Sequence, residues 1–206
     1  MTKPNGQSQG EALRMKRRQF LIGSAAAATS ARAWGQRPNQ DKLKRIGVMS
    51  GCFSSILKSA ASPNDPNRTL DILDLPGMLA ERYGLHYVEL QHSHFASTEP
   101  EYLAEFRNRL KKASSQMNQI NLEFGNLNIS APEPVRRMET IDLTKRWIDH
   151  AVALGCPRVM VNPGAPTPEV RKLAIETLTT INAYAKTKKI YVTMENRGVG
   201  SSRTNP

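Results

Sequence analysis

The sequence predicts an α/β fold in which five parallel strands alternate with helices. From residue 44 onward, short runs rich in β-forming residues alternate with amphipathic stretches, the pattern of parallel strands joined by crossover helices. This spacing alone leaves open both a doubly wound sheet and part of an eight-stranded barrel. Polar side chains at the ends of the predicted strands favour the barrel, because barrel enzymes build their sites there. These side chains belong to Ser50, His92, Asn128, Asn162 and Glu195.

The predicted strands are short apolar runs bounded by turn-forming residues. They lie near residues 46–50, 86–91, 120–128, 158–162 and 190–195. In the last of them, alternation turns Tyr191, Thr193 and Glu195 to one face and the residues between them to the other, as a barrel interior and exterior require. No glycine-rich phosphate-binding turn follows the first strand, so a dinucleotide site loses its main support.

The predicted helices occupy the stretches between the strands. They cover about residues 71–83, 99–117, 139–154 and 167–186. In the second, Leu103, Phe106 and Leu110 recur at spacings of three and four residues, which places them on one face. The third ends at Gly155, a residue that readily adopts the left-handed conformation that closes a helix.

The charge is concentrated in the first part of the chain. The 206 residues carry a formal net charge of +11, but residues 1–45 hold ten Lys and Arg against two acidic residues. The remaining 161 residues carry 19 basic against 16 acidic side chains, so the body lacks the basic footprint of a nucleic-acid partner. Cys52 and Cys156 fall at opposite ends of a parallel barrel, so we expect two free thiols.

The N-terminus has the three regions of an export signal. A polar, basic stretch containing Arg17 and Arg18 precedes the apolar run 20–28, and Ala33 closes an Ala-Arg-Ala cleavage sequence. The Arg pair followed by Gln-Phe-Leu resembles the twin-arginine motif, which implies the twin-arginine export machinery as a partner and a periplasmic destination. The run is too short for a stable membrane anchor. We therefore divide the chain into a signal peptide (1–33), a linker (34–43) and a fold (44–206).

Three segments, 84–90, 161–164 and 192–198, together resemble the xylose isomerase-like TIM barrels, the sugar phosphate isomerase/epimerase superfamily. The likeness covers about residues 44–198 and implies a partial (β/α)8 barrel. In that family the glutamate that closes the fifth strand binds a divalent metal, and Glu195 matches it. The resemblance thus implies that Glu195 is both a catalytic residue and a ligand of Mn²⁺, Mg²⁺, Co²⁺ or Zn²⁺.

The family completes its metal site beyond the fifth strand. An acidic residue after the sixth strand, a histidine after the seventh and a glutamate after the eighth supply the other ligands. This chain ends at Pro206, and a barrel of this kind has roughly 250 residues. The chain is then either a fragment of a longer reading frame or a naturally shortened product, and we expect a fragment that is inactive by itself.

The resemblance implies an isomerase or epimerase that moves a proton through an enediolate of a carbohydrate substrate. Candidate substrate-binding residues are His92, Asn162 and Asn196. His94 lies two residues after His92, so an extended strand would turn both imidazoles to the same side. The alternative is a periplasmic carbohydrate-binding barrel without catalysis. The related apurinic endonucleases need more histidine ligands and a basic surface.

Overall fold

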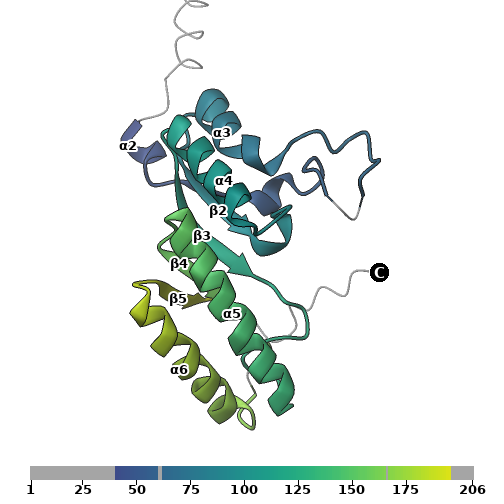
Figure 1. Cartoon of the computed structure of the whole chain (residues 1–206), viewed down its shortest axis with the longest axis vertical. Coiled ribbons are helices and arrows are strands. Elements are labelled where there is room, and N and C mark those ends of the chain that lie inside the picture. The colour runs from purple at the N-terminus through teal and green to yellow at the C-terminus, as the bar shows by residue number, and fades with distance from the viewer. Residues whose placement is uncertain (1–39, 60–61, 166, 196–206) are drawn as a thin grey trace, which may run out of the picture. The chain divides into compact units, whose positions relative to one another are not determined.

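The computed structural model describes residues 40–59, 62–165 and 167–195 of the chain (Figure 1). The chain divides into two units, residues 1–40 and residues 41–206, and the second contains the fold. The predicted signal peptide and linker therefore lie almost entirely outside the described residues. Among those described, no helix is long and apolar enough to cross a membrane.

A single parallel sheet organises the second unit. Its strands are β1 (Gly47–Met49), β2 (Tyr87–Gln91), β3 (Gln116–Leu122), β4 (Arg158–Val161) and β5 (Tyr191–Met194). They pair in the order β1-β2-β3-β4-β5, each parallel to the next. A doubly wound sheet reverses its strand order at a switch point, whereas a barrel adds each strand beside the last. The sequential order therefore confirms the predicted partial barrel.

The helices of the described residues are α2 (Gln40–Leu43), α3 (Leu75–Tyr83), α4 (Pro100–Lys112), α5 (Pro134–Leu154) and α6 (Arg171–Thr187). Helices α4, α5 and α6 pack against the sheet as a layer, and α3 packs against α4 (Figure 1). Right-handed crossovers between neighbouring parallel strands place successive helices on the same side of the sheet. That arrangement leaves the opposite, inner face of the sheet for the site.

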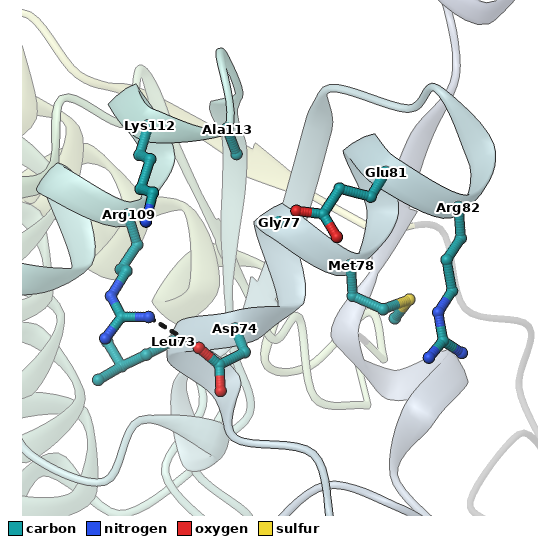
Figure 2. Close-up of a pocket in the computed structure, with 9 residues that line it drawn as sticks. All are labelled: Leu73, Asp74, Gly77, Met78, Glu81, Arg82, Arg109, Lys112 and Ala113. Atoms are coloured by element: carbon teal, nitrogen blue, oxygen red, sulfur yellow. Dashed lines mark hydrogen bonds and ion pairs between the residues drawn. The ribbon is translucent and has the colours of Figure 1, made fainter.

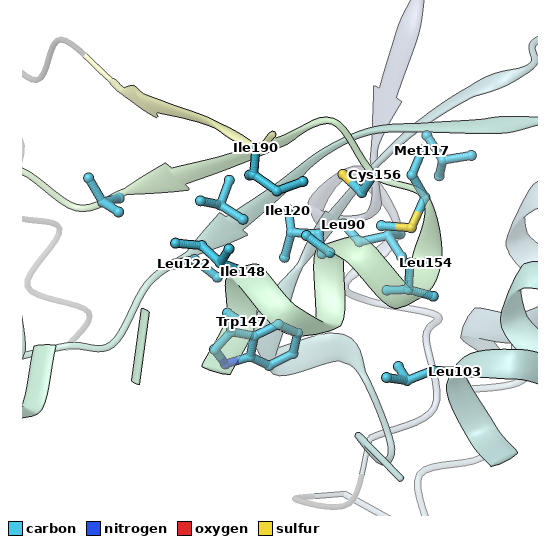
Figure 3. Packing of buried hydrophobic residues seen from close by; sticks show 14 of the residues in the cluster. Leu90, Leu103, Met117, Ile120, Leu122, Trp147, Ile148, Leu154, Cys156 and Ile190 are labelled. Atoms are coloured by element: carbon cyan, nitrogen blue, oxygen red, sulfur yellow. The ribbon is translucent and has the colours of Figure 1, made fainter. Parts of the chain in front are cut away.

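The core lies between the helices and the outer face of the sheet (Figure 3). Ile120 and Leu122 of β3 are almost fully buried and belong to the same cluster as Trp147 and Ile148 of α5. Burying one such side chain stabilises the fold by about 1.5–3 kcal/mol. From Gln119 onward, β3 thus alternates between side chains on the inner face and side chains in the core.

Local chemistry explains where the helices begin and end. Helices α3, α4 and α5 each carry proline in the first turn, where its missing N–H costs no helical hydrogen bond. Helices α3 and α5 end at Gly84 and Gly155, whose φ values of 64° and 72° lie in the left-handed region. The end predicted at Gly155 is therefore confirmed.

The boundaries between α4 and β3 differ from those expected. The helix ends at Lys112, because Ser114 adopts a φ of 50° and the chain turns there. Strand β3 then begins at Gln116, four residues before the expected start, and pairs Gln116 with Tyr87. A bulge at Asn118 shifts the register, and Arg158 stabilises it by donating to the Asn118 carbonyl at 3.2 Å and to its Oδ1 at 2.5 Å.

Candidate functional site

A cavity of about 460 Å³ opens on the inner face of the sheet, and every strand contributes to its lining. The lining residues are Met49, Glu89, Gln91, Gln119, Asn121, Glu123, Met160, Thr193, Met194 and Glu195. Most of these side chains are polar, although barrel interiors are usually filled by branched apolar residues. The inner face is therefore suited to a polar ligand.

A chain of hydrogen bonds crosses this inner face from β5 to β1. Thr193 Oγ1 donates to Gln119 Oε1 at 3.0 Å, Gln119 Nε2 donates to Asn121 Oδ1 at 2.8 Å, and Asn121 Nδ2 lies 3.1 Å from Met49 Sδ. These residues come from the first, third and fifth strands, the alternate-strand layering of a barrel interior. The chain fixes the side chains that form the floor of the cavity.

Glu195 follows β5 and lines the cavity together with Thr193, two residues earlier. Ile190 lies on the other side of the sheet, in the core. This agrees with the alternation expected along the strand. Met194 differs, because it also borders the cavity and is half exposed at the sheet edge.

Asn162 follows β4, and both polar atoms of its side-chain amide form hydrogen bonds. Its Nδ2 donates to Glu123 Oε2 at 3.1 Å, and its Oδ1 accepts the Gly164 N–H at 2.9 Å. Glu123 follows β3 and lines the same cavity as Glu195. The structure thus shows a hydrogen bond between Asn162, a predicted substrate-binding residue, and Glu123, a carboxylate that the sequence analysis did not single out.

A detectable signal for Glu123 existed in the sequence. Gln119, Asn121 and Glu123 alternate with Ile120 and Leu122, so a strand with its apolar residues facing the helices turns all three polar side chains inward. The predicted third strand began only at residue 120, which hid the first member of this polar series.

His92 packs among aromatic rings near the ends of β2 and β3. Its ring meets Phe124 edge-on with 4.7 Å between centroids, and Trp147 at 5.6 Å. The Glu123 N–H donates to His92 Nδ1 at 3.1 Å, so the neutral ring carries its proton on Nε2. Burial lowers the pKa of His92 below its usual value of 6.5. A neutral imidazole with Nε2–H is a hydrogen-bond donor.

His94 does not share the environment of His92. Residues 92–94 form a 3-10 turn, where an extended strand had been expected, so the two imidazoles have different partners. His94 Nδ1 lies 2.8 Å from the Oγ of Ser50, a fully buried hydroxyl that also accepts the Gln91 N–H at 3.0 Å. Burial and then the charge of Arg68 lower the pKa of His94.

A second cavity, of about 360 Å³, lies between α3 and α4 on the outside of the fold (Figure 2). Arg109 crosses it and pairs with Asp74 at 2.9 Å, while its Nε binds Glu105 at 2.6 Å. These charged side chains are about half exposed, and surface ion pairs of this kind contribute little to stability. The cavity lies on the helix layer rather than at the strand ends.

Other predicted site residues remain without a structural test. Asn196, Arg17, Arg18 and Ala33 lie outside the described residues. Within the described part of the chain, no group of three or more His, Cys, Asp or Glu is arranged to hold a metal ion. Glu195 thus offers one charged oxygen ligand, and the described residues alone do not complete a metal site.

Residues 78–202 match the model of the xylose isomerase-like TIM barrel family, which is more than half of the chain. The chain belongs to this family. No curated protein sequence matches it. Membership agrees with the sheet order, the inner-face cavity and the position of Glu195 after the fifth strand.

Three solved structures of similar fold are two sugar 3-epimerases and an epimerase-like protein. A D-tagatose 3-epimerase-like protein is 18% identical, with a TM-score of 0.55 over 75% of this chain and 54% of its own. D-Allulose 3-epimerase from Methylomonas sp., in complex with D-allulose, is 18% identical, with a TM-score of 0.52 over 72% and 49%. D-Psicose 3-epimerase from Clostridium cellulolyticum H10, with D-tagatose, is 11% identical, with a TM-score of 0.56 over 71% and 50%.

The TM-scores of these three matches show a shared fold. The chain spans about half the length of each of the three solved structures.

Proposed function

We propose that this chain forms part of a metal-dependent isomerase or epimerase that acts on a sugar or sugar-like substrate. The observation that carries the proposal is the polar cavity on the inner face, with Glu195 placed after the fifth strand. Family membership supports the same activity. The cavity has about the size of sites that enclose small molecules.

A divalent ion would stabilise the negative charge of an enediolate formed when a proton moves between neighbouring carbons. Of the described residues we assign Glu195 to that ion, and the remaining ligands would come from outside the described part of the chain. The five-stranded sheet alone would then bind sugar weakly and be inactive.

The chain's own residues would bind and orient the sugar. The hydrogen-bonded floor from Thr193 through Gln119 to Asn121 presents fixed polar groups, which lose little freedom when a ligand binds. His92 and Asn196 remain our proposed substrate contacts. Asn162 is the third proposed contact, and its Nδ2 also donates to Glu123 Oε2.

We also propose that residues 1–33 direct export to a bacterial periplasm through the twin-arginine machinery, with cleavage after Ala33. The order of a basic stretch, an apolar run and small residues supports this proposal. The cofactor would then be loaded before export, because that machinery moves folded proteins.

The test of the activity uses the protein expressed from its natural reading frame. Binding of D-allulose and D-tagatose is measured by calorimetry with each of the four metals, and proton transfer by NMR detection of deuterium entering the sugar from D₂O. We expect binding and metal-dependent deuterium incorporation at a carbon beside the carbonyl. Absence of both would overturn the proposal, and binding without exchange would favour the non-catalytic carbohydrate-binding barrel.

A further inference from the structure

Glu123 is a carboxylate at the mouth of the cavity to which the family resemblance gives no role. It follows β3 directly and lines the same cavity as Glu195, which follows β5. Its side chain is partly buried. It therefore stands where a sugar in the cavity would meet it.

Two neighbouring segments hold Glu123 in place. Its main-chain N–H donates to His92 Nδ1 at 3.1 Å, and its Oε2 accepts from Asn162 Nδ2 at 3.1 Å. Asn162 is itself fixed, because its Oδ1 accepts the Gly164 N–H at 2.9 Å. A carboxylate held in this way needs little further ordering when a ligand arrives.

The chemistry of the group selects its ligand. An ionised carboxylate is acceptor-only, and Asn162 donates to its Oε2. Sugar hydroxyls are donors, and hydrogen bonds to a charged acceptor are roughly twice as strong as neutral ones. The carboxylate, rather than the amide that holds it, is the group suited to recognise a hydroxyl.

We propose that Glu123 is a specificity-determining residue that accepts a hydrogen bond from one substrate hydroxyl, and that Asn162 is a positioning residue for it. This inference rests on the proposed function, since it assumes that the cavity binds a sugar. It assigns substrate recognition to Glu123 and Asn162, which follow β3 and β4, and keeps this role separate from metal binding by Glu195 after β5.

The experiment is a double-mutant cycle that removes the Glu123 carboxylate from the protein and, separately, each hydroxyl from the sugar. Calorimetry measures the affinity of the parent and Glu123→Ala for D-allulose and for each of its monodeoxy analogues. We expect the parent to lose about tenfold or more in affinity for one analogue. Glu123→Ala should lose a similar factor for D-allulose and bind that same analogue with no further loss. Glu123→Gln, which keeps the shape, and Asn162→Ala are measured in parallel with thermal unfolding as the folding control.

If Glu123 only maintained the local structure, Glu123→Ala would lose the same factor in affinity for D-allulose and for every analogue. That result would overturn the proposal while the proposed function stands. Parental affinity in both Glu123 variants also overturns it. If the parent binds no sugar, the proposed function fails, and the role of Glu123 fails with it. Asn162→Ala should reduce the discrimination between D-allulose and the sensitive analogue, and unchanged discrimination would remove its positioning role.

Discussion

Gly164→Ala should destabilise the protein more than a substitution at a comparable glycine. Gly164 has a φ of 68°, and a Cβ built on it would stand 2.5 Å from the Asn128 side-chain carbon Cγ. Asn128 is held there, because its Oδ1 accepts the Ser130 N–H at 3.0 Å. The methyl group would displace this side chain as well as strain the backbone.

Two contributions set the expected loss. Left-handed backbone costs a residue with a Cβ about 1–2 kcal/mol. Displacing Asn128 adds about 1 kcal/mol for the hydrogen bond to Ser130. Gly155 provides a matched control, because its φ is 72° and a Cβ there meets nothing within 4 Å. Gly155→Ala should therefore cost only the backbone contribution.

The assay is urea unfolding of the full chain followed by circular dichroism. Gly164→Ala should lower the free energy of unfolding by about 1 kcal/mol more than Gly155→Ala does. In an Asn128→Ala background, this excess should disappear. Equal losses at the two glycines, or an excess that persists without the Asn128 side chain, would refute the reasoning.

Three further predictions concern export, thiol reactivity and pH. Replacing Arg17 and Arg18 with lysine should leave precursor in the cytoplasm, because Arg geometry matters as well as charge, and normal periplasmic accumulation on an immunoblot would contradict this. A thiol reagent should label exposed Cys52 in the native protein but not Cys156, whose pKa burial raises to about 11, and both should react after denaturation; native labelling of both would be the contrary result. Because burial lowers the pKa of His92, its protonation favours the unfolded state, so stability should fall as the pH drops below about 6.5. NMR titration of the ring checks this, and a pKa above 6.5 would contradict it.

Local patterns in the sequence were enough to predict the five strands and the direction of Glu195. Alternation along β5 is a local property, and it correctly turned Thr193 and Glu195 toward the cavity. The start of β3 was missed for two reasons. Ser114, which is not a glycine, adopts the positive φ in the turn that ends α4, where its N–H donates to the Lys111 carbonyl. The bulge at Asn118 depends on pairing with β2, which no local residue preference reports.

The connections within the site were harder to predict. Glu123 gains its position from Asn162, 39 residues away on the neighbouring strand, and no local pattern reports such a pair. His92 and His94 were expected to point together, but a 3-10 turn separates their environments. Sequence spacing predicts the direction of a side chain only where the backbone forms a regular strand or helix.

Metal binding by Glu195 is the most direct test of the proposed function. The measurement is calorimetric titration of Mn²⁺ into the protein from its natural reading frame and into Glu195→Gln, with His92→Ala as the control. Glu195→Gln keeps the side-chain volume and removes the charge. It should weaken metal binding at least about tenfold, because loss of even an outer-shell partner of a metal ligand typically costs that much. His92→Ala should bind the metal with nearly parental affinity. If Glu195→Gln binds the metal as tightly as the parent, Glu195 is a structural carboxylate and the proposed metal site is wrong.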